Sequence, residues 1–224
     1  LAPTTLLSTA TSITGSGLDV NLPPALYDAS RRYCQTYCVD AVPVLDDTPA
    51  AVLSYRGPGA VLPNIWWIVG GRVPKGQFDE TRTLEDKVRS ELGIDVAITE
   101  RDYIGRGRMI MLPGTTANTK DYTINTPTGL YAVTIARSSL EKLQSGDGNE
   151  KWKVFPAEKI ADDTTLHPYV RLGSLVAIDR IHGAGWRENI HPTLRNIGYP
   201  QEGDDLHRLN FIPLEIQRSP RTKA

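Results

Sequence analysis

A glutamate that closes a helix, one short loop beyond a pair of glycines, is the feature of this sequence with the clearest chemical meaning. Residues 65–94 read IWWIVGGRVPKGQFDETRTLEDKVRSELGI, with the glycine pair at Gly70 and Gly71 and the glutamate at Glu91. Glycine lets a backbone approach a ligand where a Cβ would obstruct it. Carboxylate oxygens suit hard cations such as Mg²⁺ or Mn²⁺, and such a cation can help a diphosphate to leave. The pattern therefore predicts that Glu91 can hold a divalent cation beside the glycines.

The same segment resembles the box of the Nudix family. That box runs Gly, five residues, Glu, seven residues, Arg-Glu, a hydrophobic residue, any residue, Glu-Glu, any residue, Gly. Glu91 is the acid that this helix keeps in place, and the loop carries one extra residue. The other box positions are taken by Gln77, Asp86, Lys87 and Ser90.

Within that family, the segment is similar to the GDP-mannose mannosyl hydrolases, which share Gly-Gly-Arg-Val, a following Lys and a final Glu-Leu-Gly. The matching residues are Gly70, Gly71, Arg72, Val73, Lys75, Glu91, Leu92 and Gly93. The resemblance extends over roughly residues 39–178. It implies that the carbonyl of Gly71 and the carboxylate of Glu91 ligate Mg²⁺ or Mn²⁺, and that Arg72 and Arg56 hold the diphosphate of a nucleotide-diphosphate sugar.

One departure from that family concerns its general base. The family has a Gln ligand and a His base shortly before a Trp-containing strand, and these positions fall on Gly148 and Asn149. A neutral amide cannot take a proton from water near pH 7. If the loop shifts by one residue, Glu150 or Asp147 supplies the base, and these two acids are the candidate catalytic residues.

Each candidate binding residue also has a plainer interpretation. Glu91 could instead pair with Lys87, one helical turn away, whose ammonium group would repel a cation or replace one. Arg72 could be a surface arginine of the loop, and Arg56 a solvated charge at a strand end. His167 could bind substrate or could cap a helix. Adjacent strand residues point to opposite sides, so one of Trp66 and Trp67 belongs in the core, and Trp67 is our candidate for stacking on a nucleobase.

The elements that must position these residues alternate along the chain. Strands are expected at VDAVPVL, AAVLSYR, IWWIV ending at the glycines, IDVAIT, YIGRGRMIM, GLYAVTIA and WKVFP. Helices are expected at residues 24–38, from Asp79 as N-cap to Leu92 with Gly93 as C-cap, at SSLEKLQ, in PAEKIADD and around SLVAIDRI. The acids Glu80, Glu85 and Asp86 are expected on a solvated helix face.

The resulting fold class is α/β, a Nudix-type α/β/α sandwich around a mixed sheet with N- and C-terminal extensions. We expect an arm and short helix over residues 1–38, the domain over residues 39–182 and an extension over residues 183–224. The extension would wrap the domain or reach a partner. A homodimer is a reasonable expectation from the resemblance.

Composition narrows the function class. The chain has 224 residues, 40% of them hydrophobic, and a formal net charge of −1, so a nucleic-acid partner is not expected. No apolar run approaches the ~18 residues of a membrane span, and no signal peptide is evident. We expect a cytoplasmic protein with Cys34 and Cys38 as buried thiols. The first hypothesis is a divalent-metal-dependent hydrolase of a GDP-mannose-like nucleotide sugar; the alternative is an inactive Nudix-fold module serving as a ligand sensor or as a structural subunit.

Overall fold

The computed structural model describes residues 37–60, 62–74, 77, 79–111, 124–146, 148–183 and 214–215. Within these residues eight strands form one mixed sheet: β1 Cys38–Leu45, β2 Ala50–Arg56, β3 Trp66–Trp67, β4 Val69–Arg72, β5 Tyr103–Met111, β6 Ile124–Ile135, β7 Asn149–Pro156 and β8 Leu214–Glu215. The helices are α2 Glu80–Leu92, α3 Ala157–Asp162 and α4 Pro168–His182, with 3₁₀ turns at Glu100–Asp102 and Arg137–Lys142.

The sheet divides at β1, and this division creates the place where the glycines lie. One edge of β1 pairs in parallel with β6 along its whole length. On its other edge, the first half of β1 pairs with β4, whereas Val44 near its end pairs with β2. β2 then pairs with β3 and with β7. The glycine pair in β4, the end of β2 and the start of β7 therefore meet at one end of the sheet.

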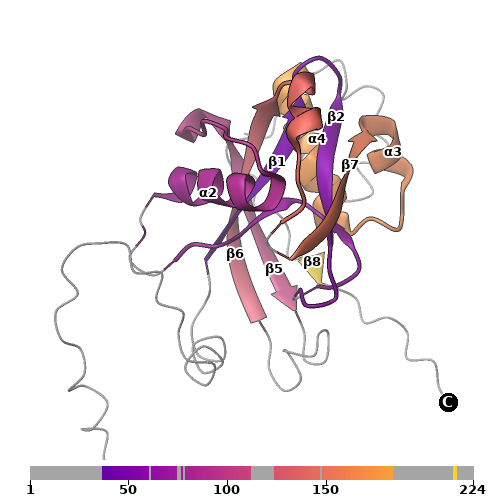
Figure 1. The fold of residues 1–224 in the computed structure, drawn as a ribbon. Helices are drawn as coiled ribbons and strands as arrows, with labels where there is room; N and C mark the ends of the chain where they lie inside the picture. Colours follow the sequence, from indigo (N-terminus) through magenta and orange to yellow (C-terminus); the bar gives the residue numbers. More distant parts are fainter. Residues whose placement is uncertain are drawn as a thin grey trace, which may run out of the picture.

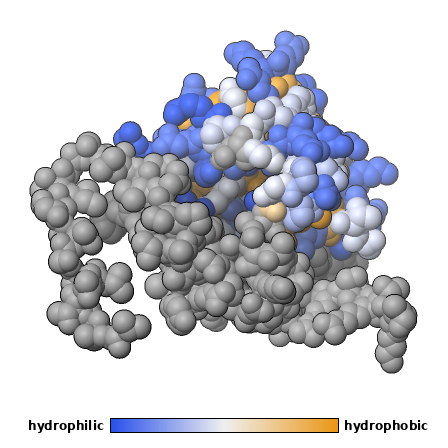
Figure 2. All heavy atoms as spheres, turned by 60° about the horizontal axis from the view of Figure 1, so that its bottom comes forward, coloured by the Kyte–Doolittle hydropathy of each residue, from blue (hydrophilic) through white to orange (hydrophobic). Residues whose placement is uncertain are grey.

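Helices cover both faces of the sheet (Figure 1). One apolar core lies between the sheet and α2, and includes Val39, Val69, Leu84, Val88 and Leu92. A second core lies between the sheet and α3 and α4, and includes Val42, Leu53, Trp67, Ile160, Tyr169 and Leu175. This arrangement confirms the predicted α/β/α sandwich with a mixed sheet. Figure 2 shows one face of the described surface, where hydrophilic side chains dominate and hydrophobic ones form small separate patches.

Helix α2 begins and ends where the sequence predicts. The side chain of Asp79 accepts a hydrogen bond from the backbone N–H of Arg82 at 3.0 Å, which satisfies an N–H group without a partner inside the helix. Gly93 ends the helix in the left-handed region, with φ 74°, and its N–H donates to the carbonyl of Arg89. Leu84, Val88 and Leu92, spaced four residues apart, are fully buried. The caps and the apolar stripe together fix the rotation of the helix and so the direction of Glu91.

Two of the expected strands are wrong. The strand at residues 65–69 does not stop at the glycines: the chain forms β3, breaks at Ile68, and continues as β4 through Gly70 and Gly71 to Arg72. Residues 94–99 form no strand, because the backbone N–H of Ile98 is taken by the carboxylate of Glu85 at 2.9 Å. Apolar alternation alone did not distinguish this extended segment from a strand.

The acids of α2 also differ from the expectation of a solvated face. Glu80 is half-buried and accepts a hydrogen bond from the hydroxyl of Tyr131 at 2.8 Å. Glu85 binds the backbone of Ile98, as described above. These acids fasten the helix to β6 and to the segment that follows the helix. Asp86 remains exposed, as predicted.

Several predictions concern the ends of the chain. Cys38 lies in β1, so the expected helix over residues 24–38 does not reach it; residues 24–36, with Cys34, lie outside the described residues. β8 falls in the expected C-terminal extension and pairs in parallel with β5. The described helices include none with the length and apolar character that a membrane crossing requires. The domain boundaries, the homodimer and the cytoplasmic location stay predictions.

The left-handed cap at Gly93 leads to a first prediction. A Cβ at this position would lie 3.1 Å from Cβ of Gln144, and a non-glycine residue costs about 1–2 kcal/mol in this backbone region. We expect Gly93→Ala to lower the free energy of unfolding by at least about 1 kcal/mol in urea titrations. Gly59→Ala is the control, because a Cβ there meets nothing within 4 Å. Equal stability of the two variants would contradict the role of the cap.

Candidate functional site

Glu91 faces the glycine pair, as the sequence predicts. Its side chain is 7% exposed. One carboxylate oxygen accepts a hydrogen bond from the N–H of Gly70 at 3.4 Å, and the other accepts one from the side-chain amide of Asn149 at 2.8 Å. Both oxygens are thus engaged by donors from β4 and β7. A buried carboxylate needs such donors to offset the loss of water.

Lys87 lies against the second glycine. Its Cε and Nζ are 3.3 and 3.8 Å from the point where a Cβ of Gly71 would stand. A residue with a side chain at position 71 would push the lysine away, because 3.3 Å is tighter than an ordinary van der Waals contact. The absence of a side chain at Gly71 therefore makes room for Lys87.

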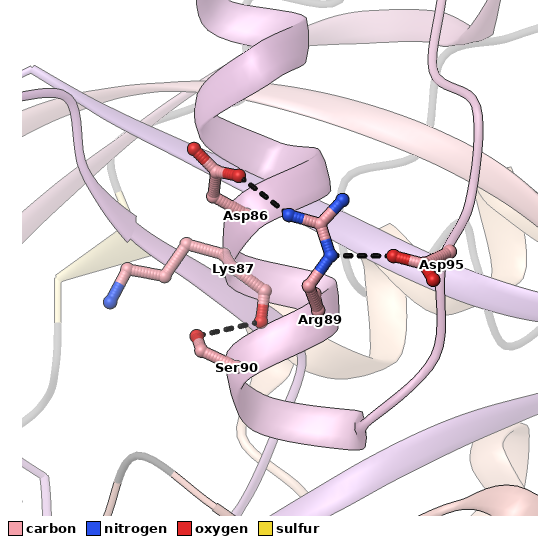
Figure 3. Close-up of polar contacts among 5 residues, drawn as sticks. All are labelled: Asp86, Lys87, Arg89, Ser90 and Asp95. Carbon is pink, nitrogen blue, oxygen red and sulfur yellow. Dashed lines mark hydrogen bonds and ion pairs between the residues drawn. The ribbon is translucent and has the colours of Figure 1, made fainter.

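Two other residues of α2, Asp86 and Ser90, make their contacts away from the glycine pair. Asp86 pairs with Arg89 at 3.0 Å, and Arg89 also binds Asp95. The hydroxyl of Ser90 donates to the backbone carbonyl of Lys87 at 3.1 Å. Figure 3 shows that the side chain of Lys87 extends away from the ion pairs of Arg89. Asp86 therefore belongs to a surface ion-pair network, and Ser90 caps its own turn.

The residues around Glu91 do not fit a divalent cation. Among the described residues, no group of three or more His, Cys, Asp or Glu side chains is arranged to hold a metal ion. Mg²⁺ requires near-octahedral oxygen ligands, whereas Glu91 supplies one carboxylate that already accepts two hydrogen bonds. Lys87 adds a positive charge beside Gly71, the residue whose carbonyl was expected to ligate the ion. The predicted Mg²⁺ or Mn²⁺ site at Gly71 and Glu91 is therefore not supported by its surroundings.

The charges of three cationic side chains reach the Cys38 thiol at the start of β1. Burial and, to a smaller extent, the negative charge of Asp40 raise the pKa of the Cys38 thiol to about 12. Arg72, Arg56 and Lys87 all act on the same thiol in the opposite direction, by electrostatic attraction. These two arginines are the ones for which the family resemblance implies a diphosphate contact. The three side chains come from β2, β4 and α2: Arg56 lies over the ring of Trp67, on the side of α4, whereas Lys87 lies against Gly71, on the side of α2.

Asp40 is a residue of this region that the sequence analysis missed. It pairs across the sheet with Gly70, and a Cβ on that glycine would overlap its carboxylate. The hydroxyl of Tyr169 donates to Asp40 at 2.8 Å. Burial raises the pKa of Asp40 to about 7, although the Tyr169 hydrogen bond and the charge of Arg56 oppose the rise. An acid inside the apolar run VDAVPVL was a signal that could have identified it.

The rings of Trp67 and His167 pack against each other on the side of the sheet that faces α4. Trp67 is 5% exposed; its ring lies 5.2 Å from that of His167 and 5.7 Å from that of Tyr169, with the Arg56 guanidinium 5.8 Å from its centre. A ring surrounded in this way has no face left for a base, so the expected stacking of Trp67 on a nucleobase is wrong. The adjacent Trp66 is the half-exposed member of the pair.

His167 is the N-cap of α4, which was the plainer of its two interpretations. Its Nδ1 accepts a hydrogen bond from the N–H of Tyr169 at 3.2 Å. Burial lowers the pKa of His167 to about 4, so the imidazole is neutral at pH 7 and can accept that bond. The cap orients the first turn of α4, from which Tyr169 reaches Asp40.

Of the two acids expected as general bases, one is not described and the other is exposed. Asp147 lies outside the described residues. Glu150 is exposed, and its Oε1 is 3.6 Å from where a Cβ of Gly57 would stand. Successive strand residues point to opposite faces, and it is Asn149 that reaches Glu91. The described contacts therefore place Glu150 beside the end of β2, and it is the neutral amide of Asn149 that lies next to Glu91.

Comparisons with known proteins give the following. No protein-family model matches the chain, and no curated protein sequence matches it. Among solved structures, the chain is similar to a MutT protein from Methanosarcina mazei Go1, with 16% identity, coverage of 69% of this chain and 95% of that chain, and a TM-score of 0.49. It is similar to the NUDIX domain of Shewanella oneidensis NrtR complexed with ADP ribose, with 15% identity, coverage of 72% and 97%, and a TM-score of 0.46. A MutT NUDIX hydrolase from Burkholderia pseudomallei has 16% identity, coverage of 66% and 98%, and a TM-score of 0.44. At these identities and TM-scores the likeness does not assign the chain to a family.

The buried carboxyl of Asp40 leads to a second prediction. Because its pKa in the folded protein lies above that of an unfolded chain, its contribution is fully present below about pH 4 and is lost as the pH rises toward 7. Asp40→Asn keeps an acceptor for Tyr169 and cannot ionise. We expect the parent to lose stability relative to this variant between about pH 4 and pH 7, by on the order of a few kcal/mol. Urea unfolding across this pH range measures the difference.

Asp47→Asn is the matched control for that experiment. Its hydrogen bond with Arg137 lowers the pKa of Asp47, so the parent should instead lose stability relative to this variant as the pH falls below about 4. A stability difference between Asp40→Asn and the parent that does not change from pH 4 to pH 7 would contradict the burial of an ionisable Asp40.

Proposed function

We propose that the protein is a Nudix-type module that binds a nucleotide diphosphate or nucleotide-diphosphate sugar, and that it acts as a ligand-binding module. The observation that supports the proposal is that the charges of Arg56, Arg72 and Lys87 all act on Cys38, next to the glycine pair, and that Lys87 also lies against Gly71. Phosphate oxygens are well matched to the planar fork of arginine and to the point charge of lysine. A glycine-lined backbone allows close approach of such a group.

The Nudix-type assignment rests on local geometry of the chain's own residues. A strand carries the glycine pair, a loop follows, and a capped helix ends in Glu91, Leu92 and Gly93. The helix carboxylate returns to the backbone of the first glycine. This return is what the box resemblance implies, and the helix caps and apolar stripe are sufficient to produce it.

The same surroundings favour binding over metal-dependent hydrolysis. Hydrolysis of a nucleotide sugar by the resembled mechanism needs a metal and a base. The region has one carboxylate already engaged by two donors and a neutral Asn149 at the position of the base. What the residues can do is attract, position and neutralise a diphosphate.

A hydrolase is the second candidate, and one observation favours it. Asp40 lies against Gly70 and within electrostatic reach of Arg56. A carboxyl group whose pKa lies near 7 can exchange a proton at neutral pH, so Asp40 has the acidity that a general acid or base requires. Hydrolysis would then proceed with a different base from the two that the sequence suggested.

Calorimetric titration with GDP-mannose and GDP, with product analysis, separates these functions. Binding of either ligand without release of mannose or phosphate at high protein concentration is the expected result. Turnover of GDP-mannose that Asp40→Asn abolishes would instead establish the second candidate. Absence of binding to both ligands, with and without Mg²⁺, would overturn the proposed function.

Arg72 supplies a third prediction. Loss of a hydrogen bond to a charged group costs about 1.5–3 kcal/mol, so Arg72→Met should weaken GDP binding about ten- to a hundredfold. Arg137→Met is the control, because Arg137 pairs with Asp47 at the opposite end of β1. Equal affinities of the two variants would remove Arg72 from the proposed binding site.

A further inference from the structure

Resting on the proposed function, we infer that the ammonium group of Lys87 takes the place of a divalent cation, so that this site binds a diphosphate without metal. The inference goes beyond binding itself, because it states which group neutralises the ligand and which cofactor the protein does not need.

The position of the lysine is the first argument. Lys87 and Glu91 are four residues apart on α2, and therefore lie on the same side of the helix. Glu91 reaches the N–H of Gly70, and Lys87 reaches the space left open by Gly71. The carboxylate and the ammonium group thus lie beside adjacent glycines. In the resembled site, a carboxylate of the helix and the carbonyl of the second glycine share a metal ion at this place.

The charges are the second argument. A divalent cation beside the carbonyl of Gly71 would meet the positive charge of Lys87 and experience repulsion. A phosphate group at the same place is attracted by that charge, and the charges of Arg56 and Arg72 also act on the neighbouring start of β1. The ammonium group therefore favours an anion where the resembled site favours a metal.

The state of Glu91 is the third argument. In a metal site, a buried carboxylate of this kind is neutralised by the ion. Here the amide of Asn149, at 2.8 Å, and the N–H of Gly70, at 3.4 Å, bind its two oxygens. Asn149 stands where the resembled family has its base, so one substitution removes the base and at the same time satisfies the carboxylate. The lysine and the asparagine therefore both lie beside the glycine pair and Glu91, at positions where the resembled family has an acid and a base.

The experiment titrates the full chain with GDP in EDTA and in excess Mg²⁺, and titrates it separately with Mn²⁺ alone. We expect equal affinity for GDP in both buffers and no Mn²⁺ binding. Lys87→Met should weaken GDP binding about ten- to a hundredfold in EDTA. Arg82→Met is the matched control: it removes one positive charge from an exposed position of the same helix and should leave the affinity unchanged.

A gain of function completes the test. Lys87→Glu places a second carboxylate one turn from Glu91, and we expect this variant to bind Mn²⁺ measurably, with a signal in the electron paramagnetic resonance spectrum. Lys87→Gln, which removes the positive charge without adding a carboxylate, should not bind the ion. Lys87→Arg, which keeps a positive charge, should retain metal-free GDP binding, and thermal unfolding of each variant identifies any that fail to fold.

The outcomes separate this inference from the proposed function. GDP binding by the parent that EDTA abolishes would overturn the inference and leave the proposed function intact. Failure of GDP to bind in either buffer would overturn the proposed function. Mn²⁺ binding by the parent equal to that of Lys87→Glu would overturn the inference whatever happens with GDP, because the lysine would then not exclude a cation.

Discussion

The buried carboxylate of Glu91, held by the N–H of Gly70 and the amide of Asn149, is the interaction on which the site depends. It ties three elements together, since α2, β4 and β7 each contribute one group. Burial of an acid is costly without such partners, so the contact also constrains how these elements pack. The apolar stripe of α2 sets the rotation of the helix, and the two donors hold the carboxylate at the end of that stripe.

The glycine pair lets groups from both faces of the sheet approach one strand. On the side of α4, a side chain at Gly70 would overlap the carboxylate of Asp40; on the side of α2, one at Gly71 would crowd Lys87. Strand β4 therefore has an acid against one glycine and a base against the next. The two faces of this thin stretch of backbone therefore carry groups of opposite kind, an acid on one side and an amine on the other.

Asn149 and Glu150 show how the pairing of strands decides which of two neighbouring side chains reaches Glu91. The two residues are neighbours at the start of β7, and strand geometry sends their side chains to opposite faces. The neutral amide reaches the buried carboxylate, and the ionisable acid lies by Gly57. The register between β2 and β7, which shifts between Tyr55 and Arg56, decides which of the two faces inward. No property of either residue alone makes that choice.

The sequence by itself determined the local features: the extent of α2, its caps at Asp79 and Gly93, and the return of Glu91 to the glycines, because short-range spacing and capping chemistry control them. It also placed Arg56 at a strand end and offered a helix cap as one interpretation of His167, whereas Arg72, expected in the loop, belongs to β4. Tertiary structure alone decided that β3 and β4 are separate, that residues 94–99 are not a strand, that Trp67 is buried, and that Asp40 meets Tyr169 129 residues away. Such contacts join residues that are distant in the chain. The face of a strand that a side chain occupies depends on the pairing register and on what packs against that face, and a local sequence pattern determines neither of these.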